Sequence, residues 1–187
     1  MTASAFCRTY FRLKVKGLQN LPRGNRVIIT ANHSSFADPV IMAAAISRPV
    51  IWIIRKDVFD VWWLKWFFTL AGMIRENGSV DKAIRVMDSG YTLGIFPEGG
   101  RSDDGRLVAG KKGIAVIALR TGVPVVPCAI IGSYEAYPRG AILPKPRRVE
   151  YVIGEPLFFD KKQSPSEAEV SAALENIMSK IRGLMEK

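Results

Sequence analysis

The sequence of 187 residues contains one histidine, two cysteines and no apolar run of the roughly 20 residues that a membrane-spanning helix needs. His33 is therefore the single candidate for any chemistry that uses an imidazole near neutral pH. Cys7 and Cys128 lie far apart and lack the spacing of metal ligands, which argues against a zinc site and indicates a reducing compartment. Residues 1–16 mix basic side chains with aromatics and do not resemble a signal peptide.

The composition predicts a folded protein with a polyanionic partner. Apolar residues make up 48% of the chain, and its length suits a single domain, residues 1–187, with one sizeable core. Within it we expect a short amphipathic segment at 1–17 and a C-terminal helix at about 166–186. The formal net charge of +10 indicates nucleic acid, anionic lipid or a phosphorylated substrate as partner. Nucleic acid is disfavoured, because the aromatic residues cluster in an apolar run and do not interleave with cations.

Apolar segments with the features of strands alternate with helical segments along the chain. Strands are predicted at 13–17, 27–31, 50–54, 91–96, 123–131 and 149–153. Helices are predicted at 3–11, 39–46, 79–89, 114–120 and 167–185, and the last of these begins after a capping Ser164 or Ser166. This alternation is typical of an α/β protein with a largely parallel central sheet flanked by helices.

The connection between the predicted strand 27–31 and the helix that follows holds His33 and, five residues later, Asp38. Open α/β sheets place their ligands at such strand-to-helix connections. A carboxylate on one imidazole nitrogen would orient a base that takes a proton through the other nitrogen. The alternative is structural, because Ser35 or Asp38 could serve only as the N-cap of the helix, with Pro39 at its first turn. The residues alone leave both interpretations open.

Residues 61–74 form an apolar run that includes three of the four tryptophans. The run is too short to cross a bilayer, and tryptophan at this density favours the headgroup layer of a membrane. We therefore expect docking on a membrane through Trp62, Trp63, Trp66 and Phe67. The alternative is a buried helix with large aromatic residues, each indole of which would need a hydrogen-bond partner.

The loop after the predicted strand 91–96 suits a phosphate group. Residues 99–102, Gly-Gly-Arg-Ser, combine accessible backbone N–H groups with a guanidinium and a hydroxyl. Arg75, Lys111 and Lys112 add cations near other predicted element ends. The preceding Glu98 is a carboxylate among cations and could pair with Arg101 or hold a substrate hydroxyl. The run matches neither a Walker loop nor a dinucleotide fingerprint.

Taken together, these blocks resemble the glycerolipid acyltransferase family that includes the 1-acylglycerol-3-phosphate acyltransferases. The family's Asn-His-x4-Asp block matches residues 32–38, and its Phe-Pro-Glu-Gly-Thr-Arg-Ser block matches residues 96–102, with Gly100 in place of threonine. Residues 72–75 are similar to a block that ends in arginine, and residues 123–127 match an apolar Val-Pro-Val-x-Pro block. The basic residues at 111–113 lie where the family commonly has them. Four blocks in order make the resemblance specific.

The resemblance implies a glycerol-3-phosphate acyltransferase-like fold and acyl transfer from an acyl-thioester, on coenzyme A or acyl carrier protein, to lysophosphatidic acid. It implies that His33 is the general base, that Asp38 orients it and that no metal or other cofactor is needed. The substrate-binding residues that it implies are Arg75, Glu98, Gly99, Arg101, Ser102, Lys111 and Lys112. The enzyme would act peripherally on the cytoplasmic, inner face of an anionic membrane. The alternatives are another lysolipid or aminolipid acceptor and, from a different class, a non-catalytic lipid-binding module.

Overall fold

The computed structural model describes residues 3–46, 48–55, 73–76 and 80–186, and for 53–55 and 73–76 only the backbone. A seven-stranded sheet with the order β1-β7-β6-β2-β5-β3-β4 forms its centre. The strands are β1 (Lys14–Lys16), β2 (Ile28–Ala31), β3 (Val50–Arg55), β4 (Met73–Glu76), β5 (Thr92–Ile95), β6 (Val125–Ile131) and β7 (Glu150–Ile153). Adjacent strands are parallel except β6 and β7. The predicted α/β class with a largely parallel sheet is confirmed.

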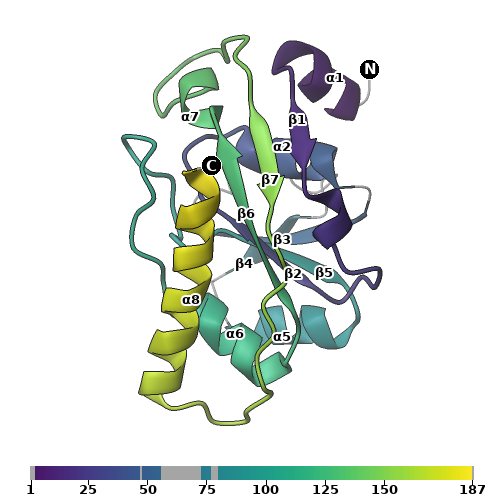
Figure 1. The fold of residues 1–187 in the computed structure, drawn as a ribbon, viewed down its shortest axis with the longest axis vertical. Helices are drawn as coiled ribbons and strands as arrows, with labels where there is room; N and C mark the ends of the chain where they lie inside the picture. Colours follow the sequence, from purple (N-terminus) through teal and green to yellow (C-terminus); the bar gives the residue numbers. More distant parts are fainter. Residues whose placement is uncertain (1–2, 47, 56–72, 77–79, 187) are drawn as a thin grey trace.

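Helices cover both faces of this sheet (Figure 1). They are α1 (Ala3–Tyr10), α2 (Asp38–Ala45), α5 (Val80–Asp88), α6 (Gly113–Thr121), the short α7 (Ser133–Ala136) and α8 (Glu167–Met185), with one 3-10 turn at Leu18–Asn20. On β2, Ile29 and Ala31 pack with α1 and α2, whereas Ile28 packs with α5, α6 and α8. Because successive side chains of a strand point to opposite faces, this apolar strand supplies both cores at once.

The last helix begins where the sequence predicts. The Ser166 side chain accepts a hydrogen bond from the backbone of Glu169, and the Glu169 side chain accepts one from the backbone of Ser166, so a complete capping box starts α8. Ser166, and not Ser164, is therefore the cap. The buried residues Val170, Ile177 and Ile181 then hold α8 against α6 and the sheet.

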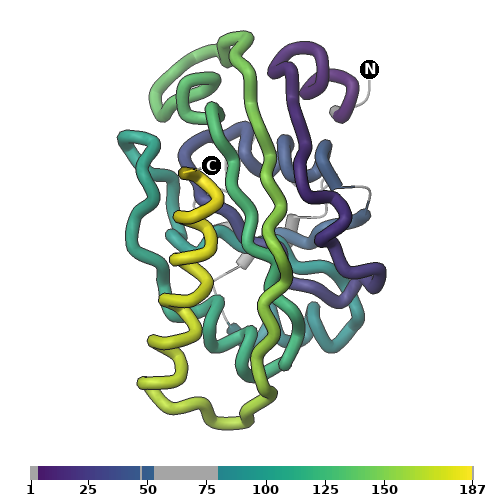
Figure 2. The backbone as a smooth tube through the Cα atoms, viewed as in Figure 1, coloured from purple at the N-terminus to yellow at the C-terminus, as the bar shows by residue number. Residues whose placement is uncertain are grey.

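The segment between α7 and β7 lies at one end of the molecule, beside α1, as the ribbon and the chain trace both show (Figures 1 and 2). Hydrogen bonds join this segment to two helices. Tyr10 Oη of α1 donates to the Pro144 carbonyl, and the Lys145 N–H donates to the Ala136 carbonyl of α7. None of the helices described is both long and apolar enough to cross a membrane.

Candidate active site

Three loops that carry polar residues meet at the carboxyl ends of neighbouring parallel strands. His33 follows β2, residues 96–102 follow β5, and α7 follows β6, and β2 lies between the other two strands. The backbone N–H of Ser102 donates to the His33 carbonyl at 2.8 Å, so the loops after β2 and β5 are in direct contact. This edge is where parallel sheets bind ligands.

Asp38 holds the His33 ring and the loop around it. The Nδ1 atom of His33 lies 2.8 Å from Asp38 Oδ2, and the N–H groups of Ser34 and Ser35 donate to the same oxygen, each at 2.8 Å. A carboxylate oxygen only accepts, so the proton of the neutral ring lies on Nδ1 and Nε2 is left as the acceptor. No residue in the described part of the chain forms a hydrogen bond to Nε2. The pair therefore has the form of a general base with an orienting acid.

Neither Ser35 nor Asp38 is the N-cap of α2, so the alternative in which they serve only as a helix cap is wrong. The N-cap of α2 is Ala37, which makes no side-chain cap hydrogen bond, and Asp38 is the first helical residue, followed by Pro39. Ser35 Oγ accepts from the Ala37 N–H but donates to the Tyr137 carbonyl. Asp38 thus lies on the helix and reaches back to the His33 loop, which is the geometry that the catalytic interpretation requires.

An aromatic stack supports the other side of the imidazole. The Phe96 ring lies nearly parallel to the His33 ring, with centroids 4.0 Å apart, and Trp52 stacks on Phe96 at 5.4 Å. The His33 side chain keeps 16% of its surface exposed, so a substrate can reach it. Neither aromatic residue was among the site residues predicted from the sequence. For Phe96 a signal was present, because it lies directly after β5 at the start of the 96–102 block.

Glu98 connects two loops by accepting from backbone N–H groups. Its Oε1 lies 2.5 Å from the backbone nitrogen of His33, and its Oε2 lies 2.9 Å from that of Val108. The residue is 5% exposed, and this burial raises the pKa of the Glu98 carboxyl to about 7, against the opposing effect of the two hydrogen bonds. The expected ion pair between Glu98 and Arg101 is absent from the described contacts. A contact between Glu98 and the acceptor substrate stays a prediction.

The glycine after Glu98 lets a cation approach the loop. Gly99 has φ +67°, and a Cβ there would lie 2.7 Å from Lys111 Nζ. Only glycine combines this left-handed backbone with so close a neighbour. The Lys111 N–H also donates to the Pro97 carbonyl at 2.7 Å, so Lys111 borders the loop as expected. Lys112 instead forms an ion pair with Glu167 at the start of α8.

Arg101 lies over an aromatic ring with one nitrogen unpaired. Its guanidinium carbon is 3.4 Å from the centroid of Phe36, and its Nη1 atom is buried without a hydrogen-bond partner among the described residues. The Ser102 Oγ and Asp38 Oδ1 atoms are unpaired in the same way. Burial, and then the charge of Arg139, lowers the pKa of Arg101. Buried donors without hydrogen-bond partners destabilise a folded protein, and an anion bound to Arg101 or Ser102 would supply the missing acceptor.

Helix α7 braces the histidine loop from the side of β6. Ser34 Oγ and Ser133 Oγ lie 3.2 Å apart, and the Asn32 side chain exchanges two hydrogen bonds with the backbone of Ile130. The helix at 133–136 was not predicted from the sequence. Four residues carry little periodic signal, and the partners lie about a hundred positions from His33 in the chain.

Two groups of predicted site residues cannot be placed. Trp62, Trp63, Trp66 and Phe67 lie outside the described residues, and so does the side chain of Arg75. The backbone of Arg75 pairs with Ile54 in the strand pair β3–β4. Membrane docking by the four aromatic residues and substrate binding by Arg75 remain predictions.

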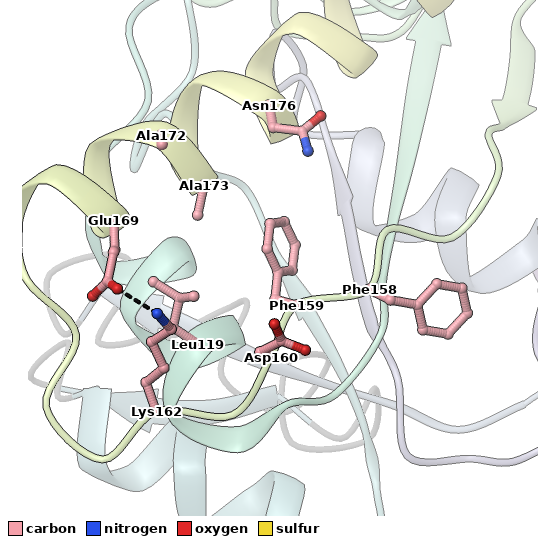
Figure 3. A pocket seen from close by; sticks show the side chains of 9 residues that line it. All are labelled: Leu119, Phe158, Phe159, Asp160, Lys162, Glu169, Ala172, Ala173 and Asn176. Atoms are coloured by element: carbon pink, nitrogen blue, oxygen red, sulfur yellow. Dashed lines mark hydrogen bonds and ion pairs between the residues drawn. The ribbon is translucent and has the colours of Figure 1, made fainter.

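A shallow hollow of about 340 Å³ lies elsewhere, between α6, α8 and residues 158–162 (Figure 3). Leu119, Phe159 and Ala173 line it, Lys162 and Glu169 form an ion pair at its rim, and Phe158 points away from the rest. None of its lining residues is among those around His33. The hollow is thus separate from the polar loops.

Known acyltransferases resemble this chain in sequence. Residues 12–131 match the family model described as Acyltransferase, which is more than half of the chain, so the protein belongs to the acyltransferase family. The chain is similar to the 1-acyl-sn-glycerol-3-phosphate acyltransferase BAT2 of Brassica napus, with 31% identity over 74% of this chain and 43% of that protein. It is also similar to the 1-acyl-sn-glycerol-3-phosphate acyltransferase of Bacillus subtilis, with 28% identity over 94% of this chain and 89% of that protein.

A solved structure supports the same assignment. The 1-acyl-sn-glycerophosphate acyltransferase PlsC of Thermotoga maritima superimposes with a TM-score of 0.79 and 28% identity, covering 98% of this chain and 77% of that one. The chain spans only about 41–43% of the length of the first plant relatives. The family resemblance noted from the sequence is confirmed.

Proposed function

We propose that this protein transfers a fatty acyl group from an acyl-thioester to the free hydroxyl of lysophosphatidic acid, giving phosphatidic acid in phospholipid biosynthesis. The observation that carries the proposal is the His33–Asp38 pair, in which one carboxylate oxygen holds Nδ1 at 2.8 Å and leaves Nε2 as an acceptor. The names of its relatives support this substrate class.

In the proposed reaction, His33 Nε2 takes the proton of the acceptor hydroxyl as its oxygen attacks the thioester carbonyl. The carbon–sulfur bond of the resulting tetrahedral intermediate then breaks, and the thiol leaves with the proton that His33 returns. Asp38 stabilises the imidazolium that exists between these two steps. Because a thioester is already activated, the enzyme needs no nucleophile and no metal or other cofactor.

The acceptor phosphate would bind where cations border the loop after β5. Arg101 offers a buried and unpaired Nη1, and Ser102 a buried and unpaired hydroxyl. Lys111 lies against the Gly99 turn. We assign these groups, together with Arg75, to the acceptor, and we give Lys112 a lesser part because it pairs with Glu167.

We further propose that the enzyme works at the inner, cytoplasmic face of an anionic membrane, where its lipid substrates reside. The net charge of +10 and the tryptophan-rich apolar run at 61–74 favour such peripheral docking. Nucleic acid is not an expected partner. Coenzyme A and acyl carrier protein are the two carriers proposed for the thioester, and both belong in the test.

The decisive experiment measures acyl transfer with both donor types over a panel of lysophosphatidic acid, other lysophospholipids and an aminolipid precursor, corrected for thioester hydrolysis. Product should form with lysophosphatidic acid at the highest kcat/KM, and only while His33 is present. Transfer to another acceptor in preference would replace the proposed substrate but keep the chemistry. Lipid binding without transfer to any acceptor would favour the non-catalytic alternative.

A further inference from the structure

The segment between α7 and β7 exposes apolar side chains that no packing within the described structure accounts for. Ile142 is 91% exposed and Leu143 is 75% exposed. The segment itself lies at the end of the molecule beside α1 (Figures 1 and 2). Two adjacent and almost fully exposed aliphatic side chains are costly in water, and such surfaces mark binding sites.

The same segment is basic. Residues 138–148 contain Arg139, Lys145, Arg147 and Arg148 and no acidic residue. Arg139 pairs with Asp103 and Arg148 with Glu150, whereas Lys145 and Arg147 form no ion pair with any described residue. An exposed aliphatic pair followed by two cations without ion-pair partners among the described residues suits an anionic lipid surface. The aliphatic side chains would enter the headgroup layer, and the cations would meet the lipid phosphates.

The segment is held in shape, so its apolar tip is presented and not merely mobile. Its base is closed by the hydrogen bond from the Lys145 N–H to the Ala136 carbonyl at 2.7 Å, and Tyr10 Oη binds the Pro144 carbonyl at 2.7 Å. Prolines at 138, 144 and 146 restrict the backbone further. A preorganised tip loses little conformational entropy on docking.

Contacts connect this segment to the catalytic loop. Tyr137 Oη donates to the Ile142 carbonyl, the Tyr137 carbonyl accepts from Ser35 Oγ, and the Tyr137 ring lies 6.2 Å from that of Phe36. Phe36, which carries Arg101 on its ring, is itself 44% exposed. Tyr137 therefore connects Ile142 by direct contacts to the edge of the site.

We propose that Ile142 and Leu143, with Lys145 and Arg147, form a membrane-docking tip that sets the His33 side of the protein against an anionic bilayer. This inference deepens the proposed membrane association by adding a contact independent of the tryptophan-rich apolar run at 61–74. The bilayer is favoured over an acidic protein because the aliphatic pair projects from the surface and does not line a groove.

The test compares vesicle binding of the full chain and of two double variants with a matched control. Ile142→Ser with Leu143→Ser should weaken partitioning onto phosphatidylglycerol-containing vesicles at least about tenfold, because two aliphatic side chains no longer leave water. Lys145→Ser with Arg147→Ser should weaken it about fivefold per cation at low salt and little at high salt.

Phe158→Ser provides the control, because Phe158 is also 75% exposed but lies at the other end of β6, where Leu157 pairs with Val125. It should bind vesicles like the wild type. All variants should keep the unfolding temperature of the wild type, because the replaced side chains are exposed. Equal losses in the control and the tip variants would overturn the proposal.

A fluorescence measurement separates insertion from general adhesion. Cys7 and Cys128 are fully buried, and burial raises their thiol pKa to about 11 and about 12, so both resist labelling. An environment-sensitive dye on Ile142→Cys should shift to the blue on adding vesicles, whereas the dye on Phe158→Cys should not. An unshifted dye at position 142 on vesicle-bound protein, or tip variants that lose binding only to acyl carrier protein, would refute the membrane assignment. Neither readout requires acyl transfer, so failure of the proposed reaction would be seen separately.

Discussion

Replacing Asp38 by asparagine isolates the charge of the orienting acid, because the structure dictates how the amide must lie. Three donors converge on Asp38 Oδ2, namely His33 Nδ1 and the N–H groups of Ser34 and Ser35, whereas Oδ1 has no partner in the described part of the chain. The amide oxygen of asparagine should therefore take the Oδ2 position and its NH2 group the empty one. The His33 tautomer is then preserved, and what is lost is the negative charge.

The size of the effect follows from that geometry. Opposite charges about 4 Å apart attract by about 4 kcal/mol at an effective dielectric constant of 20, which sets a ceiling for the stabilisation of the imidazolium. Replacing the charged hydrogen-bond acceptor by a neutral one should lower the stabilisation of the imidazolium by at least about 1–2 kcal/mol. We expect kcat to fall about 10²-fold. This is less than the roughly 10⁴-fold loss in a serine protease triad, where the amide also imposes the wrong tautomer.

The assay follows thiol release from the acyl donor at saturating acceptor, corrected for hydrolysis, together with thermal unfolding. The unfolding temperature should fall by only a few degrees, since the hydrogen bonds remain. Asp160→Asn serves as a matched control, because that carboxylate is exposed at the distant hollow. An Asp38→Asn enzyme with normal kcat would show that the carboxylate only shapes the loop, and the proposed mechanism would fail.

Four further outcomes are expected. His33→Ala should lower acyl transfer about 10²–10⁴-fold with the fold intact, and retention of more than about a tenth of the rate would end the mechanism. Arg101→Ala should raise KM for the acceptor more than KM for the donor, because ground-state phosphate binding is lost; equal effects in steady-state kinetics would remove that assignment. Replacing the three tryptophans within residues 62–66 by serine should lower the salt-resistant part of vesicle binding in co-sedimentation, and an unfolded variant with unchanged binding per folded molecule would identify the run as core. Burial raises the pKa of Glu98 from 4.5 to about 7, so the folded state binds the proton more tightly than the unfolded state, and stability should fall as pH rises from 4.5 to about 7. In urea unfolding, Glu98→Gln should flatten this pH dependence of stability, and an unchanged pH profile would contradict the reasoning.

Much of the fold could be predicted because local patterns specify it. The apolar run around β2 indicated a strand buried on both faces, and the structure places its side chains in both cores. The capping box of α8 involves only residues 166–169, so the local sequence placed the helix start to within the choice of Ser164 or Ser166, and the structure selects Ser166. The antiparallel step between β6 and β7 was not predicted, because strand order depends on how distant segments pack.

For the site, the sequence by itself determined which residues were candidates, and the tertiary structure decided what each one does. His33 stood out as the only imidazole, but the choice between an orienting acid and a helix cap at Asp38 depended on the direction of one side chain. The Glu98 contact with His33, and the Phe96 ring stacked on His33, follow from the adjacency of β2 and β5. Such contacts join residues more than 60 positions apart. No local periodicity encodes them, because they arise only when the sheet has formed.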